Sequence, residues 1–166
     1  MPNLFQFNAS EIFLVANVFL YELTAHSRWG QSCHQFIKKI EGGAISGFTS
    51  SAVIAEVVHK LMLLEACDRF HVQMHEAIDY LKRHFHKIKT LNNYRNALEH
   101  IYNLPNLTIL EITNSIFIQS HALIRKYQLL SSDAVRAAIC QAHKIRHIAT
   151  NDKDFMRVKA LTVWQP

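Results

Sequence analysis

The sequence predicts a three-layer α/β/α fold, in which a twisted, mainly parallel sheet of about four to five strands is flanked by helices. Two patterns predict it: short apolar runs typical of buried strands recur along the chain, and each is followed by apolar residues at helical spacing. The composition agrees, with 49% hydrophobic residues, 19% charged residues, four Gly and three Pro. Such a chain folds compactly and contains no low-complexity segment.

The 166 residues are enough for one domain with a substantial core and too few for two of ordinary size, so we expect a single domain spanning residues 1–166. The N-terminal apolar stretch lacks a basic flank and is interrupted by Asn17 and Glu22. We therefore expect a cytoplasmic protein without signal peptide or membrane span. Three unpaired cysteines predict free thiols, and the net charge of +5 favours an anionic partner.

The first part of the chain predicts a strand that leads directly into a helix. Residues 12–16 form an apolar run, and residues 17–25 then predict a helix with Asn17 as its cap. A second helix is predicted over residues 31–41, because its apolar residues recur at helical spacing and Gly42-Gly43 follows.

The same strand-to-helix pattern then repeats. Residues 44–49 predict a strand, and Ser50 or Ser51 is suited to cap the long apolar-faced helix that follows. Residues 70–104 fit two consecutive helices with their junction near Asn92-Asn93.

The last third of the chain alternates in the same way. Residues 107–112 predict a strand, and a helix follows from Thr113 or Asn114 to about Tyr127. A further helix is predicted from Ser131-Ser132-Asp133 to about His143. Short strands are predicted at residues 147–150 and 161–164.

Acidic residues occur in the helix after the second predicted strand, at the start of a later helix and just after a further strand, and ligands of parallel sheets bind where such strand ends, loops and helix starts gather. They are Glu56, Asp133, Asp152 and Asp154. Each has a purely structural interpretation: Asp133 in a first helical turn stabilises the helix dipole, Asp152 or Asp154 caps a short helix, and Glu56 shares a surface stripe with Lys60. If the carboxylates converge instead, they repel one another unless a hard cation such as Mg²⁺ or Mn²⁺ binds them, and such a site suits phosphodiester hydrolysis.

Four stretches together resemble the successive motif blocks of PIN domains, notably VapC-type toxins. They are FLVANVFLYEL, GFTSSAVIAEVVHKL, LLSSDAVRAAICQAHKI and IATNDKDFMRVKALTVWQP. They cover most of the chain except its helical middle. The resemblance implies a metal-dependent endoribonuclease that uses three or four acids in one cleft, and it implies a homodimer paired with a small antitoxin.

The resemblance also implies roles for individual residues. The second, third and fourth family acids fall on Glu56, Asp133 and Asp152, which implies catalytic and metal-binding roles for them, with Asp154 assisting. Thr150 and Asn151 match the polar residues that accompany the last acid.

The chain departs from the family pattern at the first block, where Val15 stands in place of the usual aspartate. Asn17 can accept a hydrogen bond nearby, but a neutral amide does not replace the lost negative charge. We therefore expect weakened binding of Mg²⁺ or Mn²⁺ and weak or absent cleavage of RNA.

Two other hypotheses compete with a nuclease. The first is a noncatalytic binding module that keeps the fold and binds an antitoxin or RNA, which Val15 favours. The second is an unrelated doubly wound domain whose acids only cap helices. The basic run between Lys82 and Lys89 fits either the steering of RNA phosphates or a solvated helix face.

Overall fold

The computed structural model describes residues 2–166. Within them the chain forms two compact units, one from residues 2–53 and 105–166 and the other from residues 54–104. A single domain over residues 1–166 stays a prediction. None of the helices in residues 2–166 combines the length and the apolar character that crossing a membrane requires.

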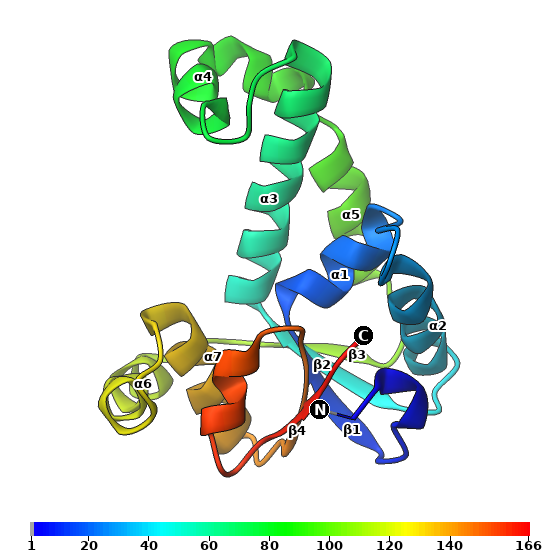
Figure 1. Cartoon of the computed structure of the whole chain (residues 1–166), viewed down its shortest axis with the longest axis vertical. Coiled ribbons are helices and arrows are strands. Elements are labelled where there is room, and N and C mark those ends of the chain that lie inside the picture. Colours follow the sequence, from blue (N-terminus) through cyan, green and yellow to red (C-terminus); the bar gives the residue numbers. More distant parts are fainter. Residues whose placement is uncertain (1) are drawn as a thin grey trace. The chain divides into compact units, whose positions relative to one another are not determined.

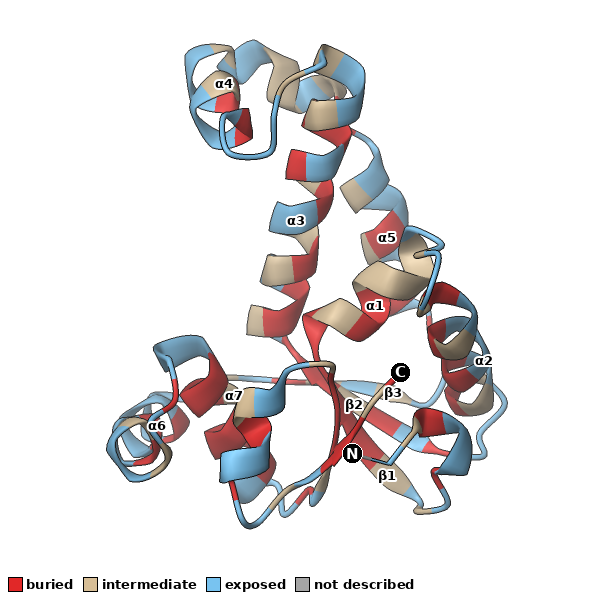
Figure 2. Ribbon diagram, viewed as in Figure 1, coloured by how far each residue is buried: buried red, intermediate tan, exposed pale blue. Residues whose placement is uncertain are grey.

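The first unit is built on a five-stranded sheet in which every pair of neighbouring strands is parallel. Its order is β3-β2-β1-β4-β5, with strands β1 (Glu11–Leu14), β2 (Ser46–Ser50), β3 (Leu107–Leu110), β4 (His147–Ala149) and β5 (Thr162–Trp164). Ile12, Phe13 and Leu14 of the central strand have no exposed surface. Figure 2 shows the same burial along the middle of the sheet. The predicted parallel sheet is confirmed, and it is parallel throughout.

Helices cover both faces of this sheet (Figure 1). The connection from β1 to β2 contains α1 (Ala16–Leu23) and α2 (Gly30–Glu41). The connection from β3 to β4 contains α6 (Asn114–Tyr127) and α7 (Ser131–Ala142) and runs across the sheet in the opposite direction. Because crossovers between parallel strands are right-handed, opposite directions place the two helix pairs on opposite faces. The predicted α/β/α layers are confirmed.

Most predicted element boundaries hold within one or two residues. Gly43 has a φ of +77° and follows the end of α2, and the Thr113 hydroxyl caps α6 by accepting from the Ile116 amide at 3.3 Å. The prediction that Asn17 caps the first helix is wrong. The strand ends at Leu14, Val15 occupies the cap position without a side-chain hydrogen bond, and Ala16 is already helical.

Short 3-10 helices were not predicted, because three to six residues carry too little periodicity to be recognised. They are η1 (Leu4–Gln6), η2 (Phe85–Thr90) and η3 (Lys153–Arg157).

The second unit is helical and has a core of its own. It contains most of α3 (Ser51–Phe70), then α4 (Ala77–Arg83), η2 and α5 (Asn93–Tyr102). Its core cluster consists of Leu63, Ala66, Ala77, Leu81 and Leu91. The two helices predicted in residues 70–104 are present, and α5 begins at Asn93, at the predicted junction.

A buried carboxylate fixes the start of α5. Glu65 of α3 is 5% exposed and accepts hydrogen bonds from the Asn92 amide at 2.9 Å and the Asn93 amide at 2.8 Å. Arg69, one turn later on α3, donates to the same carboxylate at 3.1 Å. Negative charge at a helix N-terminus is stabilising, so Glu65 joins α3 to α5 without a cap residue on α5 itself.

We expect Glu65→Ala to lower the free energy of unfolding of the second unit by about 3 kcal/mol, because two amide groups and a guanidinium lose their acceptor. Urea denaturation followed by circular dichroism measures this loss. Glu99→Ala, at an exposed position of α5, is the matched control and should change stability by less than about 0.5 kcal/mol. Equal effects of the two substitutions would contradict this role of Glu65.

Candidate active site

The sheet has one topological switch point, between β1 and β4. The chain leaves β1 towards β2 on one side and leaves β4 towards β5 on the other. The two strands pair in parallel, with Leu14 opposite Ala149. Ligands of open parallel sheets bind in the crevice at the carboxyl ends of such strands. The residues that follow Leu14 and Ala149 are therefore the first to consider.

Val15 and Asn17 lie at the end of β1. Val15 is 4% exposed, and its amide donates to the Ala149 carbonyl at 3.3 Å. The Asn17 amide nitrogen donates to the Thr150 hydroxyl at 3.2 Å. The Asn17 Oδ1 atom is buried and has no hydrogen-bond partner within residues 2–166. The start of α1 thus places the Asn17 Oδ1 atom and the apolar Val15 side chain at the carboxyl end of β1.

Thr150 and Asn151 organise the loop that follows β4. The buried Thr150 hydroxyl also accepts from the Asp152 amide at 3.0 Å. Asn151 accepts from the Gln165 side chain at 3.0 Å and donates to the Tyr21 hydroxyl at 3.4 Å. These contacts tie the loop to α1 and to the residue after β5, consistent with a supporting position for both residues.

Asp133 lies in the first turn of α7 and is 6% exposed. Burial raises its pKa above the ordinary value, and the negative charges of Asp152 and Asp154 raise it further. Arg136 acts in the opposite direction, because its Nη1 donates to Asp133 Oδ1 at 2.7 Å. Three predicted acids therefore share one electrostatic environment, although they come from two separate segments of the chain.

Asp152 and Asp154 also have structural roles in this loop. Asp152 Oδ1 accepts from the Asp154 amide at 2.9 Å and so caps η3, as the structural interpretation expected. Asp154 Oδ2 lies 3.1 Å from Arg157 Nη2. Capping uses one oxygen of Asp152, so its exposed carboxylate still has acceptor capacity for a cation or a substrate group.

Glu56 belongs to the second unit, in the second turn of α3, where it is half-buried. Its membership of a site with the three aspartates stays a prediction. Arg136 and Arg157 were missed by the sequence analysis. Both lie three residues after a candidate acid, and this helical spacing was the available signal.

The candidate ligand atoms are oxygens, the type that a hard divalent cation prefers. Asp133, Asp152 and Asp154 supply carboxylate oxygens, and the Asn17 Oδ1 atom is buried without a partner in the described chain. The number of donors falls short, since no three His, Cys, Asp or Glu side chains of residues 2–166 are grouped closely enough to hold a metal ion. Val15 at the end of β1 and Arg136 on Asp133 both reduce the negative charge of the site.

Comparison with known proteins agrees with this architecture. A family model described as the PIN domain matches residues 12–161. Ribonuclease VapC2 of Methanocaldococcus jannaschii is 28% identical over 155 residues, which cover 93% of each protein.

Two solved structures share the fold. VapBC2 of Rickettsia felis, bound to a DNA fragment from its promoter, matches with a TM-score of 0.61 and 14% identity over 93% of this chain and 98% of that one. A toxin–antitoxin complex from Klebsiella pneumoniae matches with a TM-score of 0.53 and 19% identity, over 91% and 95% of the respective chains. The fold predicted from the motif blocks is confirmed.

The raised pKa of Asp133 predicts a pH-dependent stability. A carboxyl whose pKa is higher in the folded chain stabilises folding at low pH, and this contribution is lost as the pH rises through the folded value. Asp133→Asn removes the titration and keeps an oxygen for Arg136. In buffer with a chelator, we expect it to raise the melting temperature by a few degrees at neutral pH, with the gain shrinking as the pH falls towards 3.8. A gain that does not vary with pH would contradict this account.

Proposed function

The chain belongs to the PIN-domain family, whose model matches residues 12–161, and from this premise we propose a metal-dependent endoribonuclease of the VapC toxin type that Val15 leaves weak or inactive. The resemblance to ribonuclease VapC2 over 93% of both chains supports the activity class. The proposal includes a cytoplasmic location and a homodimer. An unrelated doubly wound domain is excluded by the family match.

One observation carries the proposal. Burial raises the pKa of Asp133 on α7, and the negative charges of Asp152 and Asp154 after β4 raise it further, so these two acids lie within electrostatic range of Asp133. The Thr150 hydroxyl bonds both the Asn17 side chain and the Asp152 amide, which places the buried Asn17 Oδ1 atom, without a partner among residues 2–166, beside the same loop. Carboxylates that repel one another next to an oxygen that can still accept support a site for a cation.

The chemistry assigns a role to each residue. Glu56, Asp133 and Asp152 would hold Mg²⁺ or Mn²⁺, with Asp154 assisting, and the bound ion supplies stabilisation of charge on the phosphate and activation of water. Asn17 and Thr150 keep the ends of β1 and β4 in register through their 3.2 Å hydrogen bond. Arg136 holds the Asp133 carboxylate in one orientation and offsets its charge.

Val15 is the residue that we expect to reduce metal binding at this site. A buried isopropyl group stands at the carboxyl end of the central strand, where the family has a carboxylate. Compared with the family pattern, the site therefore has one negative charge fewer for attracting a cation. The Arg136 guanidinium also lies beside Asp133. Both effects lower metal affinity.

Val15 and Arg136 also favour a second candidate function, a noncatalytic PIN-fold module that binds an antitoxin partner or RNA. The two solved structures of similar fold are VapBC2 with promoter DNA and a toxin–antitoxin complex, which supports a small antitoxin as partner. If the module is noncatalytic, Arg136 offsets part of the Asp133 charge without a metal ion.

We expect Val15→Asp to restore or strongly increase cleavage of a labelled RNA in Mg²⁺ or Mn²⁺, because it returns the missing carboxylate. Gel analysis of the products measures the rate. Val15→Asn is the matched control, similar in size to aspartate but uncharged, and Asp133→Asn in the Val15→Asp background excludes a contaminating nuclease. Equal cleavage by the original chain and Val15→Asp would show that Val15 does not limit activity. Cleavage by neither would favour the noncatalytic module.

Metal binding is testable without activity. Carboxylates that repel one another are relieved by a cation, so Mn²⁺ should raise the melting temperature of Val15→Asp more than that of the original chain or of Val15→Asn. Thermal denaturation with and without Mn²⁺ provides the comparison. Equal shifts in all three proteins would argue against a shared metal site at position 15.

A further inference from the structure

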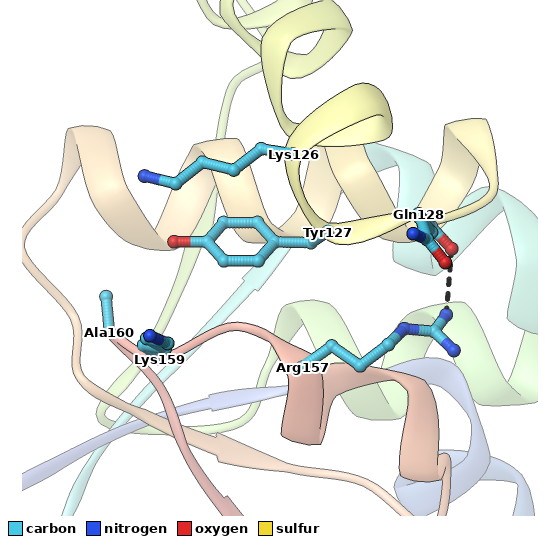
Figure 3. A pocket seen from close by; sticks show the side chains of 6 residues that line it. All are labelled: Lys126, Tyr127, Gln128, Arg157, Lys159 and Ala160. Carbon is cyan, nitrogen blue, oxygen red and sulfur yellow. Dashed lines mark hydrogen bonds between the residues drawn. The ribbon is translucent and has the colours of Figure 1, made fainter.

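A basic pocket lies beside the acidic loop in the first unit (Figure 3). It has a volume of about 780 Å³ and is formed where α6 ends and where the chain leaves η3 towards β5. Its six lining residues are Lys126, Tyr127, Gln128, Arg157, Lys159 and Ala160. The volume is within the range of roughly 300–1,000 Å³ that is usual for small-ligand sites. The size therefore suits a phosphate group together with a ring system.

Three of the lining side chains are cations and none is a carboxylate. In the described part of the chain, neither Lys126 nor Lys159 lies within ion-pair distance of an acid. Two lysines that line one pocket without a carboxylate partner favour an anionic ligand, whereas Arg157 is already paired with Asp154. Lysine near the end of α6 also stabilises the helix dipole, but that effect does not account for Lys159, which lies outside any helix.

The pocket also offers an aromatic surface. The Tyr127 ring is half-buried, and Lys126 Nζ lies 5.1 Å from its centroid. Figure 3 shows Lys126 and Tyr127 extending in the same direction from the end of α6, with Lys159 and Ala160 on the other side of the ring. Aromatic rings flanked by cations are the usual elements for binding single-stranded nucleic acid, because bases stack on the ring and phosphates pair with the cations.

Arg157 connects this pocket with the acids. Its Nη2 donates to the Gln128 carbonyl at 2.9 Å and lies 3.1 Å from Asp154 Oδ2. One guanidinium therefore borders both the basic pocket and the carboxylates around Asp133.

We propose that this pocket binds one nucleotide of a single-stranded RNA, with its phosphate at Lys126 and Lys159 and its base stacked on Tyr127, while Arg157 borders the opposite end of the pocket. The inference rests on the proposed function and adds the place where the RNA strand is held. A single strand is required because paired bases do not offer a free face to the tyrosine ring. The pocket is a positioning subsite, and its residues do not touch the reacting atoms.

The test is fluorescence anisotropy of a fluorescein-labelled single-stranded RNA of mixed sequence, titrated with the full chain in a buffer with chelator. We expect the double variant Lys126→Ala/Lys159→Ala to bind at least tenfold more weakly. Its slope of log affinity against log salt should be shallower by about 1.4, or roughly 0.7 for each lost phosphate contact. Tyr127→Leu should weaken binding roughly tenfold and Tyr127→Phe should not, because stacking needs the ring and not the hydroxyl.

The matched control is Lys38→Ala/Lys39→Ala, which removes the same charge from α2 on the opposite face of the sheet. It should leave affinity within about twofold of the original chain, as expected for loss of nonspecific attraction alone. Melting temperatures of all variants check that each is folded.

Three outcomes would overturn the subsite: no RNA binding by the original chain, equal losses in the pocket and control variants, or unchanged binding of Tyr127→Leu. Displacement of the RNA by polyglutamate as readily as by unlabelled RNA would also overturn it and indicate an acidic peptide instead. Because the chain keeps Val15 and no metal is present, the result is independent of cleavage. A failure here is thus distinguishable from a failure of the nuclease proposal.

Discussion

The parallel pairing of β1 with β4 is the constraint on which the rest of the site depends. Leu14 lies opposite Ala149, so the residues after each strand emerge side by side at one edge of the sheet. The chain then turns away in opposite directions, and the hydrogen bond between Asn17 and Thr150 joins the two exits. A shift of this register by one residue would turn the following side chains to the other face and separate them.

The second constraint is the balance of charge at this edge. Burial raises the pKa of Asp133, and the negative charges of Asp152 and Asp154 raise it further. Arg136 and Arg157 each neutralise one of these acids through a contact across three residues. These two arginines reduce the repulsion among the acids without any further ligand. Arg157 also borders the neighbouring basic pocket.

Sequence patterns predicted the fold well because the sheet is parallel and buried on both faces. Such a sheet requires apolar strands such as residues 12–14 and helices between them, and both leave clear periodicity. Predictions failed where a side chain had a better partner elsewhere. Asn17 is a good helix cap by type, but its amide bonds to Thr150, and these residues are 133 positions apart in the sequence. Glu65 was missed for the same reason, because its partners Asn92 and Asn93 lie far along the chain.

The sequence by itself determined the order of strands and helices, the family, the candidate acids, and the presence of Val15 at the first acidic position of the family pattern. These properties are local, because periodicity, turn residues and motif spacing each involve residues that lie close together in the sequence. Only the tertiary structure decided that Asp133 is buried against Arg136 beside Asp152 and Asp154, and that Lys126, Tyr127 and Lys159 line one pocket. Burial, electrostatic coupling and cavities depend on distances between segments remote in sequence, and those distances are fixed only when the sheet and its helices pack together.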